Sequence, residues 1–243
     1  MKITLPGRIA RLFGYELVKL GRMPHRDINV HLLELFRLLD INCVLDVGAN
    51  MGQYAIALRQ AGYRGQILSF EPLRDCYAAL NQRRDERWHV FNYALGSSDR
   101  NMEIHVARKN VFSSFLPPNQ YARERFRESS RIIATEQVTV KKLDSVFDGI
   151  VPVSAPRLFL KLDTQGYDLE VLKGAKQVMP FIHGLQSELS SKAIYAGMPT
   201  HIESLKFIDE LGYEITDIFP LSHDKHDMTL LEFDCIFRRK SKV

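Results

Sequence analysis

Apolar and polar residues follow two alternating patterns along most of the 243-residue chain. Short apolar runs, which are typical of buried strands, occur at 43–47, 66–70, 89–95, 158–162 and 182–188. Stretches between them, such as 54–61, 74–83 and 169–174, have apolar residues at helical spacing. Strands that alternate with helices in this way predict a mostly parallel sheet with helices on both faces.

The last part of the chain adds an antiparallel element to this sheet. Residues 202–211 have a helical pattern that stops at Gly212, and apolar strands follow at 213–218 and 230–237. Because these two strands are close in sequence, we expect a hairpin at one edge. The pattern predicts an α/β fold with a Rossmann-like sheet of seven strands, mostly parallel, that includes an antiparallel terminal hairpin strand.

A second antiparallel pair interrupts the regular alternation. Residues 102–106 and 138–140 each alternate apolar and polar side chains, and a polar stretch at 108–135 lies between them. That stretch contains two prolines and many charges, so we expect it to form a lid or substrate loop.

Residues 1–40 form an extension before the first predicted strand, and a single α/β domain is expected at 41–243. The net charge of the chain is +4, and residues 1–26 alone hold six basic residues and one acidic residue. Apolar positions in this extension recur at helical spacing and predict a basic amphipathic helix that ends near 21–24. These positions are Ile9, Leu12, Phe13, Leu17 and Leu20. The apolar face either packs on the domain as a cap or contacts a membrane surface or a partner.

Composition argues against several functional classes. The residues after the extension are nearly neutral in sum, which argues against a broad nucleic-acid surface. No run approaches the ~18 apolar residues of a membrane span, and the three cysteines lack metal-type spacing. We therefore expect reduced thiols and a cytoplasmic protein, with possible peripheral membrane contact through the extension.

The most informative segment is VLDVGANMGQY at 44–54. An apolar strand enters a turn with Gly48 and Gly52, where the backbone can approach a ligand beyond the carboxyl ends of the strands. The segment has neither the Gly-Lys-Ser/Thr ending of a phosphate loop nor the Gly-x-Gly-x-x-Gly spacing of a pyridine-nucleotide site. Asp46 would repel a pyrophosphate but suits the ammonium and sulfonium groups of S-adenosylmethionine, so we expect this cofactor.

Two further strand ends are expected beside the same ligand. Glu71 follows the second strand, where its carboxylate is placed to accept both ribose hydroxyls of an adenosine. The third strand ends at 92–96, so we expect this segment, including Ala94, alongside the adenine ring.

In this order and spacing, the segments VLDVGANMGQY, SFEP, NYALGSSD, VTVKKLDSV and LKLDTQGYDLEVLKGA resemble the FkbM-type methyltransferases. The resemblance covers residues 42–190 and extends more weakly to the tail LLEFDCIFRR. It implies a class I methyltransferase domain that uses S-adenosylmethionine, usually to methylate hydroxyls of sugars, polyketides or other specialised metabolites. The residues that match the cofactor loop and the ribose-binding acid of the family are Asp46, Gly48, Asn50, Gly52 and Glu71.

The resemblance also implies residues at the acceptor end. Lys161 and Asp163 match the family's Lys-x-Asp-x-Glu-Gly pattern, and Glu188 matches a carboxylate at the end of the fifth strand. The chain departs from this pattern with Gln165, where Glu is usual, and with Asp168, where a second Glu often stands. The change at 165 removes a negative charge and puts in doubt a role for that position as a base or metal ligand.

Methyl transfer to an alcohol needs a base that takes the hydroxyl proton as the new bond forms. Lys161 and Asp163 are two positions apart on one strand, so their side chains point to the same side. We expect Asp163 to be the base or to orient the acceptor, and Glu188 to be a second candidate base. Lys161 is expected to orient Asp163 or to hold an acidic substrate group. The alternative for all three is a structural ion pair at strand ends.

The main functional expectation is O-methylation of a sugar, a glycolipid or a specialised metabolite. N-methylation and a non-catalytic S-adenosylmethionine-binding partner subunit are the alternatives. No metal is assigned, although the segment 222–227 offers potential ligands. These are His223, Asp224, His226 and Asp227. A solvated turn is the more common structure for such a charged segment.

Overall fold

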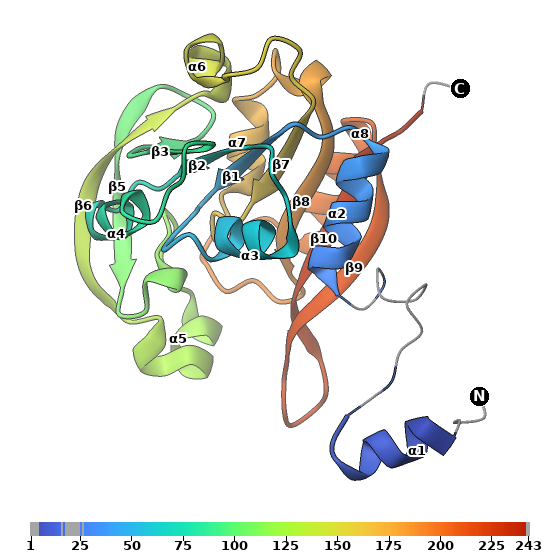
Figure 1. Cartoon of the computed structure of the whole chain (residues 1–243). Helices are drawn as coiled ribbons and strands as arrows, with labels where there is room; N and C mark the ends of the chain where they lie inside the picture. Colours follow the sequence, from blue (N-terminus) through green and yellow to red (C-terminus); the bar gives the residue numbers. More distant parts are fainter. Residues whose placement is uncertain (1–4, 16, 18–24, 26, 242–243) are drawn as a thin grey trace.

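The computed structural model describes residues 5–15, 17, 25 and 27–241, and its centre is a sheet of seven strands (Figure 1). The strand order is β3-β2-β1-β7-β8-β10-β9, in which β10 is antiparallel to both of its neighbours and the other pairs are parallel. The bounds are β1 (Cys43–Val47), β2 (Gln66–Phe70), β3 (Trp88–Phe91), β7 (Leu158–Leu162), β8 (Ile182–Ser190), β9 (Tyr213–His223) and β10 (Leu230–Arg239). This topology confirms the predicted sheet and its terminal hairpin.

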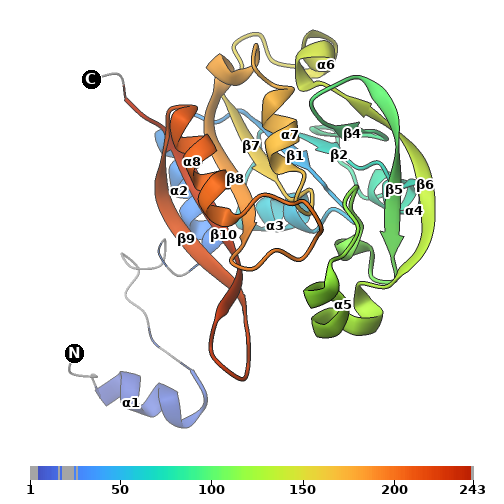
Figure 2. The same cartoon turned by 180° about the vertical axis from the view of Figure 1, so that it is seen from behind.

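Helices cover both faces of this sheet (Figures 1 and 2). Successive residues of β1 enter opposite hydrophobic clusters: Val44 packs with Leu32 and Leu58, whereas Leu45 packs with Leu172 and Ile208. The first cluster includes α2 and α3, and the second includes α6, α7 and α8. The bounds are α2 (Ile28–Leu38), α3 (Gln53–Ala61), α4 (Arg74–Asn81), α6 (Leu143–Ile150), α7 (Asp168–Lys173) and α8 (His201–Glu210). Burial on both faces explains why the central strands β1, β2 and β7 are largely apolar.

The predicted strand at 89–95 is wrong as a single strand, because its two halves belong to different sheets. The first half is β3, whereas the second half is β4, which joins a smaller sheet of order β4-β6-β5. The chain changes sheet at Asn92, whose side chain donates to the carbonyl oxygens of Glu71 and Pro72, both at 3.0 Å. The bounds of the smaller sheet are β4 (Ala94–Leu95), β5 (Arg100–Ala107) and β6 (Ile132–Lys141).

The polar stretch at 108–135 is partly helical rather than an open loop. The side chain of Asn119 caps the helix α5 within it. The Asn119 amide donates to the Ile194 carbonyl, and the Ala196 amide donates to the Pro117 carbonyl, so the stretch is fixed against the segment after β8. Its helical elements are η2 (Asn110–Phe112), α5 (Gln120–Phe126) and η3 (Arg127–Ser129).

Helix α1 (Leu5–Leu12) is shorter than the predicted N-terminal helix. It ends before Gly14, whose φ of 79° is left-handed and typical of a helix terminus. Ile9 and Leu12 are 50% and 84% exposed, so they do not pack on the domain as a cap, and both views draw α1 away from it (Figures 1 and 2). The rest of the predicted helix, at 18–24, lies outside the described residues. Within the described part of the chain, no helix is long and apolar enough to cross a membrane.

Candidate active site

A cavity of about 590 Å³ lies where the carboxyl ends of β1, β2 and β7 meet. Its wall also includes residues of β4, β8, β9, β10 and the segment 110–115. The predicted site residues that line it are Gly48, Asn50, Glu71, Ala94, Lys161, Asp163 and Glu188. Two other predicted residues, Asp46 and Gly52, are not among the residues that line it. The fold thus brings four of the six predicted cofactor residues and all three predicted catalytic residues to one cavity.

The loop after β1 requires glycine at two positions. Gly48 has a φ of 77°, and a Cβ there would lie 2.1 Å from the carbonyl oxygen of Asp163. Gly52 has a φ of 85°, and a Cβ there would lie 2.6 Å from Leu80 and 2.9 Å from Trp88. Gly48 therefore lets the ends of β1 and β7 meet, and Gly52 lets α3 begin close to α4 and β3.

Glu71 holds the same loop from the β2 side. Its Oε2 accepts the amide hydrogen of Asn50 at 2.7 Å, and its Oε1 accepts that of Leu73 at 2.9 Å. Burial raises the pKa of Glu71 to about 7, although these two hydrogen bonds act in the opposite direction. Each carboxylate oxygen has a second lone pair, so Glu71 can still accept hydroxyl groups of a ligand.

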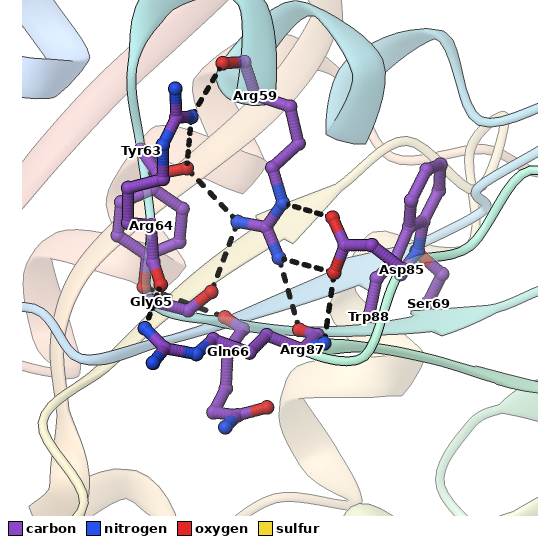
Figure 3. Close-up of polar contacts among 9 residues, drawn as sticks. All are labelled: Arg59, Tyr63, Arg64, Gly65, Gln66, Ser69, Asp85, Arg87 and Trp88. Atoms are coloured by element: carbon purple, nitrogen blue, oxygen red, sulfur yellow. Dashed lines mark hydrogen bonds and ion pairs between the residues drawn. The ribbon is translucent and has the colours of Figure 1, made fainter.

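Asp46 lies beneath the cavity rather than in its wall, and its side chain is fully buried. Its Oδ1 is 3.1 Å from Nζ of Lys161, and its Oδ2 accepts the hydroxyl hydrogen of Ser69 at 3.0 Å. The Ser69 oxygen accepts the indole N–H of Trp88 at 2.9 Å, a pair that is drawn in Figure 3. Asp46, Ser69 and Lys161 meet because they are register partners across β2, β1 and β7. Direct contact between Asp46 and a cofactor remains a prediction.

Lys161 connects buried Asp46 with Asp163, an acidic residue in the cavity wall. Its Nζ is 3.4 Å from Oδ2 of Asp163, and it donates to the carbonyl oxygen of Gly48 at 3.3 Å. Burial acts to lower the pKa of Lys161, but Asp46 and Asp163 outweigh it and keep the pKa above its ordinary value. The ammonium group is therefore charged and contacts Asp163, and its orienting role stays a prediction.

The structure adds Gln165 and Tyr195, neither of which was a predicted site residue. Nε2 of Gln165 donates to Oδ1 of Asp163 at 2.9 Å and to Oε1 of Glu188 at 3.3 Å. Oε1 of Gln165 accepts the hydroxyl hydrogen of Tyr195 at 2.8 Å. The departure from the family pattern at 165 marked that position in the sequence, but nothing marked Tyr195, which comes from the segment after β8.

Glu232 and Asp234 extend the acidic wall from β10. Asp234 is the register partner of Glu188 on β8. Burial is the main cause that raises the pKa of Glu188 and raises that of Asp234 to about 6, and Asp163 adds to both shifts. Neither residue was a predicted site residue. The alternation in the tail LLEFD, which places Glu232 and Asp234 on one face of a strand, is the sequence feature that indicates their shared position. Lys161 is the one basic residue among the described residues that line the cavity.

The small sheet supplies an apolar part of the cavity wall. Ala94 and Leu95 of β4 and Ile104 of β5 line it. Binding sites for planar organic groups are commonly lined by such side chains. The position of Ala94 is thus compatible with its predicted place beside an adenine ring, which remains a prediction.

Asp168, the second position that departs from the family pattern, is buried outside this cavity. Its carboxylate accepts the hydroxyl hydrogens of Thr164 and Ser187 and the amide hydrogen of Thr164. Asp168 therefore fixes the turn that follows β7.

The charged segment 222–227 forms the turn of the β9–β10 hairpin. Asp224 accepts the amide hydrogen of His226 at 2.8 Å and lies 3.6 Å from Nε of Arg125. In the described part of the chain, the one group of potential metal ligands lies elsewhere, at His25, His31 and Asp217. These contacts favour a solvated turn over a metal site at 222–227.

The family model of the methyltransferase FkbM domain matches residues 46–215. The matched range includes the glycine loop, Glu71, Lys161, Asp163 and Glu188. The chain belongs to the FkbM methyltransferase family.

Individual proteins that are similar to this FkbM methyltransferase in sequence or fold share 25% of their residues with it or fewer over the matched regions. Methyltransferase sdnD of Sordaria araneosa is 25% identical over 209 residues, which cover 76% of this chain and 79% of that protein. The magnesium protoporphyrin IX methyltransferase of Synechocystis PCC 6803, solved with bound SAM, has a TM-score of 0.44 at 13% identity, covering 96% of this chain and 90% of that one. The 1,6-didemethyltoxoflavin-N1-methyltransferase of Burkholderia thailandensis has a TM-score of 0.46 at 10% identity, covering 86% and 76%.

Proposed function

We propose that this FkbM-family enzyme transfers the methyl group of S-adenosylmethionine to a hydroxyl oxygen of a sugar, a glycolipid or another specialised metabolite. One observation carries the proposal: the Gly48 loop and Glu71 share a cavity with the carboxylate pair of Asp163 and Glu188. The first two are suited to an adenosine group, and the last two to a proton acceptor. Ala94 and Asn50 complete the proposed cofactor wall.

Bound S-adenosylmethionine supplies an electrophilic methyl carbon. The residues of the chain have to align the acceptor hydroxyl, take its proton and exclude water. In the proposed reaction an O–C bond forms, the C–S bond breaks, and Asp163 or Glu188 takes the hydroxyl proton as S-adenosylhomocysteine is released. Lys161 holds Asp163 in place from below through the 3.4 Å ion pair.

Calorimetric titration with S-adenosylmethionine and S-adenosylhomocysteine tests the cofactor assignment. We expect Glu71→Ala to weaken binding about 10- to 100-fold, because the two hydrogen bonds proposed from the ribose hydroxyls to this carboxylate are lost. Glu103→Ala, on the exposed edge of β5, is the control and should bind as the wild type does. A folded wild-type protein that binds neither compound would refute the proposed cofactor.

N-methylation is the second candidate, and the charge of the cavity favours it. Five carboxylate residues line the cavity with one basic residue, Lys161, in the described chain. Such a wall attracts a protonated amine and, because burial raises the pKa of Glu188 and Asp234, offers groups that can share its proton. The acidic residues are Glu71, Asp163, Glu188, Glu232 and Asp234.

Methyl-labelled cofactor and paired acceptors distinguish the two candidates. Each pair consists of a sugar with hydroxyls alone and the same sugar with one amine. Label on oxygen in both members supports the hydroxyl acceptor, whereas label confined to the amine supports N-methylation. Cofactor binding without transfer to any acceptor would support the non-catalytic alternative.

A further inference from the structure

Gln165 is fixed in the position from which it contacts the two candidate bases. Its φ of 54° is left-handed, and its carbonyl oxygen accepts the hydroxyl hydrogen of Ser114 at 2.7 Å. Its side-chain oxygen lies 2.8 Å from the hydroxyl oxygen of Tyr195, and the single hydroxyl hydrogen is shared between this oxygen and the carbonyl oxygen of Phe112 at 3.1 Å. Backbone and side chain of Gln165 are therefore both tied to the segment 112–114.

The two carboxylates determine which end of the Gln165 amide faces them. Nε2 has two hydrogens and lies 2.9 Å from Asp163 and 3.3 Å from Glu188, so it can give one hydrogen to each. If the amide were turned over, its oxygen would face two carboxylates and repel both. The observed orientation stabilises the charged forms of the two groups without adding a charge.

We propose that Gln165 is a positioning residue for methyl transfer, which holds Asp163 and Glu188 side by side and offers each carboxylate a hydrogen-bond donor. This inference rests on the proposed function. The usual family residue, Glu, cannot donate to both carboxylates when ionised and would add a negative charge to the wall. Charged or titratable groups that face the pair are Lys161 on β7, Glu232 and Asp234 on β10, and Tyr195 after β8.

The test compares Gln165→Glu and Gln165→Met with the wild type in methyl transfer. We expect kcat to fall about 10- to 100-fold in both, as for impaired proton transfer, with KM for the cofactor nearly unchanged. The acidic limb of the pH–rate profile should move upward, further in Gln165→Glu than in Gln165→Met. Gln82→Glu, at an exposed position after α4, is the control.

Binding of S-adenosylhomocysteine distinguishes a failure of the Gln165 role from a failure of the proposed function. A wild-type enzyme that binds it and transfers methyl, with an unchanged pH profile in Gln165→Glu, would overturn the role of Gln165 alone. A wild-type enzyme that binds no cofactor would instead overturn the proposed function. Tyr195→Phe should lower kcat less than Gln165→Met, since it frees the amide but keeps its donors.

Three potential metal ligands lie close together at the outer edge of the sheet, on the side of β9. They are His25, His31 at the start of α2, and Asp217 on β9, and one ligand atom of each lies within 4.8 Å of the others. Nδ1 of His25 is 2.6 Å from Oδ2 of Asp217, and Nδ1 of His31 is 3.9 Å from the same oxygen. His25 is largely exposed, which leaves it room to adjust.

Hydrogen bonds with neighbouring residues orient the His31 ring and the Asp217 carboxylate. The hydroxyl of Thr216 donates to the carbonyl oxygen of Ile236 at 3.2 Å and lies 3.0 Å from Nε2 of His31. In the tautomer with its proton on Nε2, this hydroxyl oxygen accepts that hydrogen, and the lone pair of Nδ1 is free to bind a metal ion beside Asp217. Oδ1 of Asp217 accepts the amide hydrogen of Ile218 at 2.8 Å, which orients the carboxylate. Such second contacts typically orient metal ligands.

The geometry points to a site for a divalent transition-metal ion such as Zn²⁺, held by His25, His31 and Asp217 and separate from the cavity. Two imidazoles and one carboxylate suit Zn²⁺ and leave a fourth position open. An ion here would fasten residue 25, and so the extension, to β9.

Titration of the untagged full-length protein with Co²⁺, read by visible absorption, and with Zn²⁺, read by calorimetry, tests this site. We expect one ion per chain, with affinity reduced at least about tenfold by Asp217→Asn or His25→Ala. His226→Ala is the control and should bind as the wild type does. The site is refuted if the wild type binds no ion, or if only His226→Ala lowers the affinity.

Discussion

Glu71 makes binding in the cavity sensitive to pH near neutrality. Its pKa is raised to about 7 by burial, from an ordinary value of 4.5. Between these values the folded, unliganded protein keeps a proton that the unfolded chain has lost, so Glu71 reduces stability as the pH rises through this window. A ligand that donates two hydroxyl hydrogens requires the ionised form, so its binding has the opposite dependence.

We therefore predict that the affinity for S-adenosylhomocysteine rises about tenfold between pH 6 and pH 8, since the ionised fraction of a group with a pKa of about 7 rises by that factor. Calorimetry at several pH values measures it. Glu71→Gln should bind weakly and with little dependence on pH. A rise of equal size in that variant would assign the dependence to another group.

Gly48 and Gly149 should respond to the same substitution with opposite signs. A Cβ at Gly48 would lie 2.1 Å from the carbonyl oxygen of Asp163, whereas a Cβ at Gly149 in α6 would meet nothing within 4 Å. We expect Gly48→Ala to lower the free energy of unfolding by about 1–3 kcal/mol and to abolish cofactor binding. Gly149→Ala should raise it by about 0.5–1 kcal/mol. Denaturant titration measures both, and equal changes would contradict the close approach at Gly48.

At the scale of elements, Arg59 of α3 ties a helix to the edge of the sheet (Figure 3). Its guanidinium binds both oxygens of Asp85, at 2.7 and 3.3 Å. It also donates to the carbonyl oxygens of Tyr63, Gly65 and Arg87 at 3.0–3.1 Å. One side chain thus joins the end of α3 to the starts of β2 and β3.

Lysine cannot replace this planar group, because an ammonium has three donors on one atom and cannot reach five acceptor atoms on four residues. We predict that Arg59→Lys lowers the free energy of unfolding by roughly 1–3 kcal/mol, because the part-buried carbonyl oxygens of Tyr63 and Gly65 lose a charged donor. Arg84→Lys, at an exposed position before β3, serves as the control and should change it little. Thermal unfolding followed by circular dichroism measures the difference.

The N-terminal extension exposes large apolar side chains in the part of it that the structure describes. Leu12 and Phe13 are 84% and 74% exposed, in a segment where residues 1–26 hold six basic residues. We propose that the extension contacts anionic lipid, where each basic residue contributes about 1 kcal/mol near the surface. Co-sedimentation with anionic vesicles should be lost on removal of residues 1–26 and weakened by salt. Unchanged sedimentation after truncation would leave this proposal without support.

The sequence predicted the main sheet because most of its strands are short, buried apolar runs. The split at Asn92 was missed because Ala94 and Leu95 are as apolar as β3, although they pair with another sheet. The glycine loop and Glu71 were predictable from spacing, whereas Asp163 and Glu188 were implied by the resemblance to the FkbM family. The contact of Gln165 with Glu188 and Tyr195 was not, since it depends on how segments distant in the chain are brought together.

Trp88 is the one tryptophan of the chain, and its place gives the molecule a built-in optical reporter. The indole is buried, donates to Ser69 above Asp46, and touches the position where α3 begins at Gly52. Occupation of the cavity that shifts the glycine loop would change the surroundings of this ring. Intrinsic fluorescence of the unlabelled protein should therefore report ligand binding directly, in the same sample that later reports unfolding.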